Sequence, residues 1–342
     1  MAEPWYQPPV PFHGEHLAVI GTGIAAACFA HQAAKAGYQV DVYEQAALSA
    51  SGASGNAAGI VRPKTNPNDE RYALFQEAKR AFDAMADTWQ RSDICLYRGV
   101  YHQSTGWVED AIVLNPSRWI AALLKHPNIH VHHLSPWHRE LAKPNQALIY
   151  CMGWESYLHN WPLGGGYRQV QWTRFEDIQP PPSGPIIGNG YLCPLSHRQW
   201  LVGAAHGKNF DLNSSMLKGH IKNLEVLQDL HPRLRSTTAR SGRQGVRCSV
   251  IGRWPVVGAL PDFEWAQTAY KTLYKGHRPS HYEPLRYQPN QYLITALGAR
   301  GLLLAPLCAH WLLNLLQYGE SPPPKTAAIN GLLRQLRKRP PR

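Results

Sequence analysis

The sequence predicts an α/β protein that combines a parallel sheet of the dinucleotide-binding type with a second, β-rich region. Three observations support this prediction. A strand, a glycine-rich turn, a helix and another strand follow one another over residues 16–44, and a similar strand, turn and helix recur over 291–316. Much of the sequence between them shows the alternating apolar pattern of β-strands. A chain of 342 residues is long enough for two domains.

Residues 16–44 form the first motif. The apolar run 17–20 suits a buried parallel strand, the sequence GTGIAA at 21–26 forms a glycine-rich turn, and the alanine-rich segment up to Lys35 favours a helix. Gly37 is positioned to end that helix. Residues 39–43 then predict the second strand, with Glu44 at its end.

The turn has the residues of a phosphate-binding site. Gly21 permits a tight turn, Gly23 lets the backbone approach a pyrophosphate, and the helix that follows directs free N–H groups at phosphate. Glu44 lies about 20 residues further on, where a carboxylate can accept ribose hydroxyls. We therefore predict a dinucleotide site that includes Gly21, Gly23, Ile24, Ala25 and Glu44. The alternative is an ordinary tight turn, and the motif alone does not separate NAD from FAD.

The overall charge is unusual. The chain has 35 Lys and Arg against 23 Asp and Glu, which gives a net charge of +12. This balance favours a polyanionic partner such as nucleic acid or an anionic membrane face, although a basic surface that binds nothing is the alternative. The clustered arginines of residues 233–247 could likewise be a solvated face or follow an RNA backbone.

Other features indicate the cellular setting. The six cysteines are scattered without metal-binding spacing, as expected of small buried side chains in a reducing compartment. The N-terminus lacks the pattern of a signal peptide, and no run of about 18 uncharged apolar residues predicts a transmembrane helix. The histidines between 126 and 138 fit alternating strand faces better than a metal site. We therefore expect a cytoplasmic protein with no metal and no membrane contact.

The small-residue segment 46–64 follows the acidic strand end. It could be a flexible surface loop, but a flavoprotein needs backbone amides and hydroxyls here to reach the diphosphate. Ser54, Gly55 and Asn56 are the candidate ligands. An amphipathic helix over 69–91 and paired strands on either side of 104–106 come next.

At this point a family resemblance becomes specific. GTGIAA, Glu44 and GASGNAAGIVRPK together resemble the FAD-dependent oxidoreductase domain of the bifunctional tRNA-modifying protein MnmC, within the D-amino acid oxidase and glycine oxidase superfamily. The resemblance implies a Rossmann-like FAD-binding domain with a β-rich substrate domain, a D-amino acid oxidase and glutathione reductase-like architecture. It also implies that Gly153, at the end of strand 147–153, lies near the cofactor.

Two further motifs carry the resemblance. The turn at 298–301 resembles the superfamily's C-terminal GLGSRG signature, which implies that the flavin contacts Gly298, Ala299, Arg300, Gly301 and Leu302. A helix N-terminus there would stabilise negative charge on a reduced flavin, and Arg300 would support it. GVRC at 245–248 implies that Arg247 binds a substrate carboxylate, for which a planar guanidinium is suited. The alternative is a structural arginine that donates to carbonyl groups.

The resemblance also sets expectations for organisation. It implies an FAD-binding domain over 14–92, 117–157 and 285–320, a substrate domain over 93–116 and 158–284, and flexible termini at 1–13 and 321–342. Relatives carry a longer insertion before Gly106, so the substrate domain is expected to be trimmed. MnmC usually carries a fused methyltransferase, for which the sequence has no room, so we expect a stand-alone oxidoreductase whose partner could be a separate methyltransferase.

The implied reaction is oxidation of a carboxymethylaminomethyl group on the wobble uridine of tRNA, which releases 5-aminomethyluridine and glyoxylate. The basic surface would bind the tRNA. The alternative enzyme is a small-molecule amine or glycine oxidase of the same fold. A third possibility is a flavin-binding RNA module without turnover.

Overall fold

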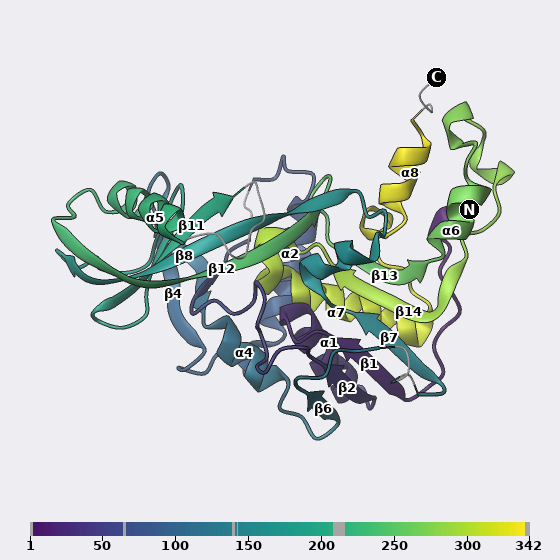
Figure 1. Ribbon diagram of the computed structural model, residues 1–342, viewed down its shortest axis with the longest axis horizontal. Helices are drawn as coiled ribbons and strands as arrows, with labels where there is room; N and C mark the ends of the chain where they lie inside the picture. The colour runs from purple at the N-terminus through teal and green to yellow at the C-terminus, as the bar shows by residue number, and fades with distance from the viewer. Residues whose placement is uncertain (1–2, 64–65, 139–140, 142, 208–215, 339–342) are drawn as a thin grey trace. The chain divides into compact units, whose positions relative to one another are not determined.

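The computed structural model describes residues 3–63, 66–138, 141, 143–207 and 216–338 (Figure 1). The chain divides into two compact units. Unit 1 comprises residues 1–49, 123–167 and 248–342, and unit 2 comprises residues 50–122 and 168–247. Each unit contains one sheet, apart from short strand ends that run past the unit boundaries.

Unit 1 is built on a six-stranded sheet in the order β13-β14-β7-β1-β2-β6. Strand β1 pairs in parallel with β2 and β7, β2 with β6, and β14 with β7, whereas β13 is antiparallel to β14. The strands are β1 (His16–Ile20), β2 (Gln39–Tyr43), β6 (Ile129–His132), β7 (Gln146–Tyr150), β13 (Val256–Pro261) and β14 (Tyr287–Thr295). The strands predicted at both ends of the chain are thereby confirmed.

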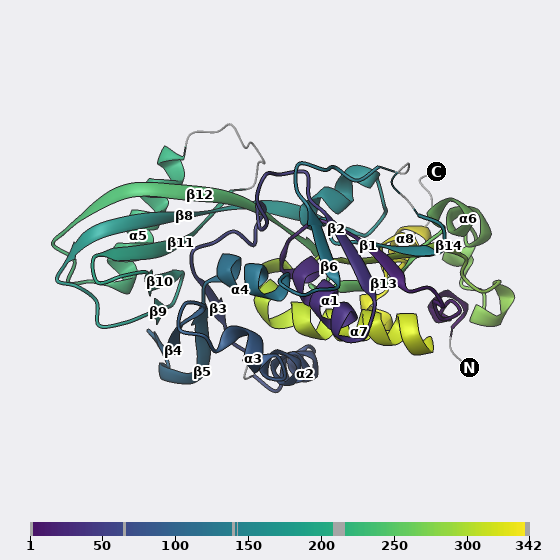
Figure 2. The same cartoon turned by 90° about the horizontal axis from the view of Figure 1, so that it is seen from below.

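Two helices cover this sheet, α1 (Ile24–Lys35) and α7 (Gly301–Tyr318). They pack against each other and lie close together in both ribbon views (Figure 2). The alanines of α1 explain the close approach, since Ala26, Ala27 and Ala30 are completely buried and add little bulk. Strand β1 is buried along 17–20, as expected of a parallel strand covered on both faces.

Helix α7 with its preceding turn, Gly298–Tyr318, is long and apolar enough to cross a membrane by length and composition. From the sequence we expected no apolar run of this length, and this segment differs from that expectation by length and composition alone. In the structure, 67% of its most apolar 18-residue window is buried. Apolar residues on nearly all sides of a helix are also expected of a core helix, which is how α7 is used in unit 1.

Unit 2 is built on an eight-stranded sheet in the order β12-β8-β11-β10-β9-β4-β5-β3. The strands are β3 (Gly59–Val61), β4 (Cys95–His102), β5 (Gly106–Leu114), β8 (Gly165–Gln179), β9 (Ile186–Ile187), β10 (Tyr191–Pro194), β11 (Gln199–Gly207) and β12 (Ser236–Val250). Helix α5 (Leu217–Leu230) packs on β10 and β11. The β-rich region predicted from alternation is thereby confirmed.

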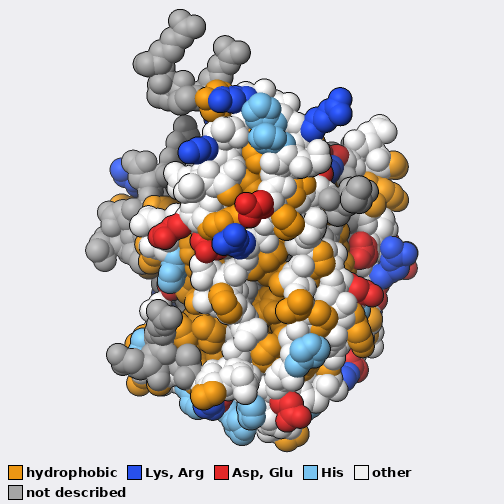
Figure 3. Space-filling view, turned by 90° about the vertical axis from the view of Figure 1, so that its right-hand side faces the viewer, with side chains coloured by type: hydrophobic (Ala, Val, Ile, Leu, Met, Phe, Trp, Pro, Cys, Tyr) orange, Lys and Arg blue, Asp and Glu red, His pale blue; other side chains and the backbone are white. Residues whose placement is uncertain are grey.

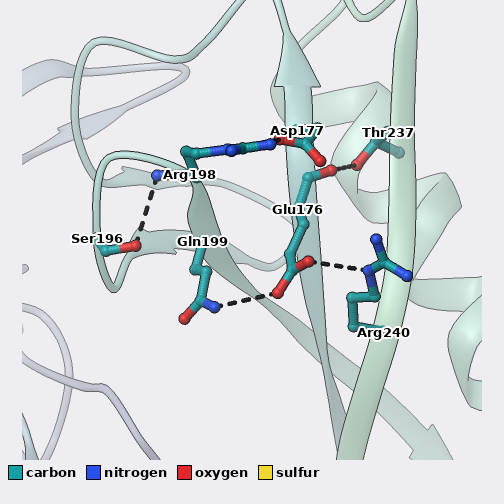
Figure 4. Close-up of polar contacts among 7 residues, drawn as sticks. All are labelled: Glu176, Asp177, Ser196, Arg198, Gln199, Thr237 and Arg240. Carbon is teal, nitrogen blue, oxygen red and sulfur yellow. Dashed lines mark hydrogen bonds and ion pairs between the residues drawn. The ribbon is translucent and has the colours of Figure 1, made fainter.

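Polar contacts tie β8 to the strands on both sides of it (Figure 4). The Glu176 carboxylate accepts hydrogen bonds from Gln199 Nε2 at 3.0 Å and from Arg240 Nε at 2.9 Å. Asp177 accepts from Arg198 Nη2 at 2.6 Å. Arg240, although exposed, therefore links β12 to β8 through its Nε.

The remaining helices differ in part from the prediction. Residues 69–91 were expected to form one amphipathic helix, but the structure has α2 (Tyr72–Asp83) and α3 (Ala86–Trp89), separated at residues 84–85. The ring of Trp89 stacks on Phe82 at 4.7 Å, which the break between the helices permits. The other helices are α4 (Pro116–Leu123), α6 (Phe263–Ala269) and α8 (Asn330–Leu336).

The compact units divide the chain differently from the predicted domains. Residues 50–92 were assigned to the FAD-binding domain, but they belong to unit 2. The reason is packing: β3 pairs with β5 in the second sheet, and Phe82 packs edge-to-face on Trp119 at 5.6 Å. Residues 158–167 and 248–284, predicted in the substrate domain, belong to unit 1, where β13 joins the parallel sheet.

The termini were predicted to be flexible, but apolar residues of both described ends pack into unit 1. Trp5 is 2% exposed and packs on Tyr270 and Tyr282. Leu332 and Leu333 of α8 are buried in the same cluster. A proline-rich start and a basic end concealed these apolar anchors in the sequence.

Candidate functional site

The glycine-rich turn follows β1 directly. Gly21 has a φ of +98°, and its N–H donates to the carbonyl of Tyr43 at 2.8 Å. A Cβ at this position would lie 2.8 Å from the carbonyl oxygen of Cys151, at the end of β7. Only glycine satisfies both the left-handed backbone and this close approach. Gly21 therefore fixes the turn between three strand ends.

Glu44 is buried at the end of β2, with 7% exposure. Its Oε2 accepts from the Thr22 N–H at 3.1 Å and from the Thr22 hydroxyl, and its Oε1 accepts from the Ala46 N–H at 2.9 Å. The carboxylate is thus held rigidly beside the turn, and a carboxylate with three such bonds still has acceptor capacity for a ribose hydroxyl. Thr22 was not predicted. A hydroxyl within a glycine turn, followed later by an acidic strand end, was the available signal.

Helix α1 begins immediately after the turn. Its N-cap is Gly23, whose extended backbone has ψ of 177° and which has no side chain to cap the first N–H groups. Such a helix end suits an anion that approaches the backbone. Ile24 and Ala25 form the first turn of the helix and are buried.

Two more glycine turns lie at the same edge of the unit 1 sheet, because parallel strands carry their carboxyl ends together. Gly153 follows β7 and has a φ of +58°, and beyond its two chain neighbours no described residue has an atom within 4 Å of where its Cβ would be. Gly298 follows β14 and has a φ of +59°. The hydroxyl of Thr295 joins the two segments, since it donates to the Gly153 carbonyl at 2.8 Å. Thr295 was also missed, because nothing in its local sequence distinguishes it.

Residues 298–302 place the start of α7 beside the start of α1. Gly298–Arg300 forms a single 3₁₀ turn, and Gly301 and Leu302 open the helix. A Cβ on Gly301 would lie 3.5 Å from Cγ2 of Ile24. Ala299 is exposed, and Arg300 is partly exposed. The structure therefore brings eleven predicted residues together within unit 1: Gly21, Gly23, Ile24, Ala25, Glu44, Gly153, Gly298, Ala299, Arg300, Gly301 and Leu302.

The other predicted residues belong to unit 2. Ser54, Gly55 and Asn56 lie in the loop between residue 50 and β3. Asn56 Oδ1 accepts from Trp172 Nε1 at 2.9 Å, and the Gly55 carbonyl accepts from Arg243 at 2.8 Å. These two residues therefore tether the loop to β8 and β12.

Arg247 lies in β12 and is partly exposed. Among the described residues, none forms a hydrogen bond or ion pair with its guanidinium, so the alternative of an arginine that donates to carbonyl groups finds no support there. Burial raises the pKa of Tyr191 to about 12, with the charge of Arg247 acting in the opposite direction. Partial burial, followed by the charges of Arg247, Arg168 and Lys222, lowers the pKa of His206. This part of unit 2 is therefore electropositive and suits an anionic group.

Within the described ranges, no three His, Cys, Asp or Glu side chains gather as a set of metal ligands. His132, from the cluster considered in the sequence, instead pairs with Asp41 at 2.9 Å and stacks on Tyr43.

Comparisons with known proteins address the class of protein and the fold. Residues 16–158 match the family model of FAD dependent oxidoreductases. The chain is 25% identical over 406 residues to the tRNA 5-methylaminomethyl-2-thiouridine biosynthesis bifunctional protein MnmC of Pseudoalteromonas atlantica, covering 92% of this chain and 57% of the relative. It is 26% identical over 398 residues to the protein of the same name from Magnetococcus marinus, covering 93% and 59%. The chain thus spans under three fifths of the length of these relatives.

Solved structures share the fold. Glycine oxidase from Geobacillus kaustophilus superposes with a TM-score of 0.70 at 14% identity, covering 93% of this chain and 98% of that one. Iminodiacetate oxidase from Chelativorans sp. superposes with a TM-score of 0.66 at 15% identity, covering 91% and 98%. At this identity the likeness establishes the fold, which confirms the predicted architecture.

Residues 16–158 match the FAD dependent oxidoreductase family, so the protein is an FAD-dependent oxidoreductase and its cofactor is FAD. The residues present fit this cofactor: the turn at Gly21 leaves no room for a side chain, the start of α1 has no capping side chain, and Glu44 is fixed beside them. The prediction of FAD over NAD is confirmed.

Proposed function

We propose that the protein oxidises the C–N bond of a secondary amine that carries a carboxymethyl group, and that this amine is the carboxymethylaminomethyl group of the tRNA wobble uridine. The products are 5-aminomethyluridine and glyoxylate. The observation that carries the proposal is Arg247, a partly exposed cation with no partner among the described residues. A guanidinium presents a planar fork that matches a carboxylate.

In this proposal each group of the chain has a positional task. Gly21, Gly23 and Glu44 hold the adenosine diphosphate half of FAD, and the turn at 298–302 holds the flavin end. When bound, FAD supplies an acceptor for a hydride. Arg247 holds the substrate carboxylate, which orients the adjacent carbon and nitrogen. Arg300 and the start of α7 support negative charge.

The electron and atom balance is simple. The carboxymethyl carbon loses a hydride and the nitrogen loses a proton, so the C–N single bond becomes C=N. Water then adds to this carbon and the C–N bond breaks, which releases glyoxylate and leaves the aminomethyl group on the uridine. A neutral amine can lose hydride directly, so the proposal assigns no acid or base to a side chain.

Two observations support a tRNA substrate. The sequence relatives are named for tRNA 5-methylaminomethyl-2-thiouridine biosynthesis, and the chain carries a net charge of +12. Figure 3 shows a face on which the described Lys and Arg side chains are scattered among hydrophobic and acidic ones, so we expect RNA to bind elsewhere. We further propose a cytoplasmic location and a separate methyltransferase that acts on the aminomethyl product.

A small-molecule amine or glycine oxidase is the second candidate. It is favoured by the fold neighbours, whose names are glycine oxidase and iminodiacetate oxidase. The alignment with the Pseudoalteromonas relative spans 406 positions although the chain has 342 residues, so that relative carries segments which this chain lacks. This agrees with the expected trimming, and lost RNA contacts would favour a smaller substrate.

Product analysis tests the proposal. The FAD-loaded protein is incubated with tRNA that bears carboxymethylaminomethyluridine, and the nucleosides and glyoxylate are quantified by mass spectrometry. Equal amounts of aminomethyluridine and glyoxylate are expected. Unchanged nucleosides, with peroxide formed from glycine or sarcosine, would contradict the tRNA proposal and support the second candidate.

A further inference from the structure

We propose that Arg243 is a positioning residue that sets the conformation of the loop at residues 50–56. Its guanidinium, on β12, donates to the carbonyl of Gly55 at 2.8 Å. It also donates to the carbonyls of Ala50 and Gly52 at 3.2 Å each, and to that of Ser51. One side chain thus gathers four carbonyls from one short loop, all within unit 2.

The charge of Arg243 makes this contact unusual. Among the described residues, no carboxylate pairs with its guanidinium, and the hydrogen-bond acceptors of this half-buried cation there are backbone carbonyls. Arginine suits this role because its planar guanidinium spreads five N–H donors over three nitrogens, whereas a lysine ammonium has three donors on one nitrogen.

We call the contact of Arg243 with the carbonyls of residues 50, 51, 52 and 55 the clamp. The clamp also sets the direction in which the amide N–H groups of the loop point. In a trans peptide the C=O and the following N–H point in opposite directions. Because the carbonyls of residues 50, 51, 52 and 55 face Arg243, the N–H groups of residues 51, 52, 53 and 56 are turned away from it. Successive amides turned to one side form an anion-binding concavity, with a positive charge behind it. The ligand class that fits is a phosphate or diphosphate.

Close packing supports the clamp. Gly55 is buried, and a Cβ there would lie 2.1 Å from Arg243 Nη1 and 2.3 Å from the Ala50 carbonyl oxygen. Two residues along β12, a Cβ on Gly245 would lie 3.3 Å from the Cα of Ala53. The far end of the loop is fixed separately by the hydrogen bond between Trp172 and Asn56. A side chain at residue 55 would displace the guanidinium from the loop.

The inference rests on the proposed role of Ser54, Gly55 and Asn56 as FAD contacts. It deepens that role, because it assigns the order of the loop to a residue outside the predicted set. The separation of 188 positions between Arg243 and Gly55 explains why the sequence did not reveal it.

The test uses the full chain, stripped of FAD, with Arg243→Ala, Arg243→Lys and the control Arg240→Ala. Arg240 lies on the same strand, but its partner is Glu176 (Figure 4). Two quantities are measured: the rate of limited proteolysis within residues 50–56, located by mass spectrometry, and the dissociation constant for FAD. Proteolysis reports local opening of a backbone segment.

Arg243→Ala is expected to raise cleavage within the loop and to weaken FAD binding by about tenfold or more, the effect of losing about 1.4 kcal/mol. Arg243→Lys should lie between it and the wild type, and Arg240→Ala should match the wild type. Unchanged cleavage would contradict the clamp. Faster cleavage with unchanged FAD affinity would contradict its role toward the cofactor, and so would equal effects from Arg240→Ala.

If Arg243→Ala does not fold, Arg243→Lys and Gly55→Ala decide the question by the same two measurements, since the methyl group of the latter displaces the guanidinium. Wild-type behaviour of both would contradict the clamp. FAD titration needs no substrate, so these results stand apart from any failure to oxidise tRNA.

Discussion

At Gly21 a left-handed backbone conformation and a close approach to the Cys151 carbonyl coincide, so the position requires glycine. Gly21→Ala adds a Cβ 2.8 Å from the Cys151 carbonyl oxygen at a φ of +98°. We expect a loss of about 1–3 kcal/mol in stability and a clear loss of FAD affinity. Thermal unfolding with and without FAD measures both quantities.

Gly37→Ala is the matched control. Gly37 has a φ of +100°, and beyond its two chain neighbours no described residue has an atom within 4 Å of where its Cβ would be. The variant therefore bears backbone strain without a clash and away from the turn. It should bind FAD as the wild type does. If Gly21→Ala also binds FAD normally, the turn at 21–25 is not the phosphate site.

Arg247 is the single residue on which the predicted binding of a substrate carboxylate depends. Arg247→Ala removes a charged hydrogen-bond donor worth about 1.5–3 kcal/mol, which is roughly a 10- to 150-fold loss in kcat/KM for a carboxylated amine. Arg247→Lys should recover only part of this, because an ammonium lacks the planar fork. Steady-state kinetics measure the loss, and an amine without a carboxylate is the control. Equal losses for both amines would exclude a carboxylate contact.

Among the helices and strands, those marked by residues within their own sequence were the most predictable. Strand β1, helix α1 and strand β2 follow directly from apolar runs, glycines and a terminal acid, and the same holds for β14 and α7. The long strand β12 was not predicted, because its clustered arginines were interpreted either as a solvated face or as a segment that follows an RNA backbone. Two of them instead serve distant partners, Arg240 bonding to Glu176 and Arg243 to the loop at 50–56.

Thr22 and Thr295 were also missed in the sequence, because their partners are distant along the chain. Thr22 contacts Glu44 only because β1 and β2 are neighbours, and Thr295 reaches Gly153 only because β14 lies beside β7. Sequence motifs identified the glycines, whose need is local. They could not identify side chains whose need arises from strand pairing.

A buried carboxylate joins two strands of the unit 1 sheet with the segment that precedes β7. Asp41 on β2 accepts from His132 on β6 at 2.9 Å and from Lys143 at 2.7 Å. Burial alone would raise the pKa of Asp41, but these hydrogen bonds outweigh it and hold the pKa below its ordinary value. Because Lys143 is half exposed, we expect Asp41→Asn to cost about 1 kcal/mol at pH 7.

The pH dependence follows from the direction of that shift. A carboxyl with a lowered folded pKa contributes stability above its unfolded pKa of about 3.9 and loses it as the pH falls through the folded value. The difference in urea midpoint between the wild type and Asp41→Asn should therefore shrink below about pH 4. Asp83→Asn, which alters the exposed pair with Lys79, is the control with a small effect. A difference that stays constant with pH would contradict the assignment.

For the whole molecule, the cofactor was easier to predict than the substrate. FAD was predicted from a few glycines and one acid, which are local signals, whereas the substrate was predicted from a single arginine and the overall charge. The net charge of +12 extends over the entire chain and indicates only the sign of a partner's charge.

Salt dependence distinguishes the two candidate substrates at this scale. Phosphate contacts release counterions, so tRNA binding should weaken by more than about tenfold for a fourfold rise in salt, measured by fluorescence anisotropy. Binding that does not change with salt would indicate that the basic surface has no part in recognition. An unmodified tRNA, which shares the phosphates, should show a similar slope.

Anaerobic flavin bleaching tests the central proposal most directly. The FAD-loaded protein is mixed, without oxygen, with tRNA that bears carboxymethylaminomethyluridine and, separately, with glycine or sarcosine, while flavin absorbance is followed. We expect the modified tRNA alone to bleach the flavin. Bleaching only by the free amino acids would contradict the tRNA proposal and identify a small-molecule amine oxidase, and no bleaching by any of them would contradict oxidation of these amines altogether.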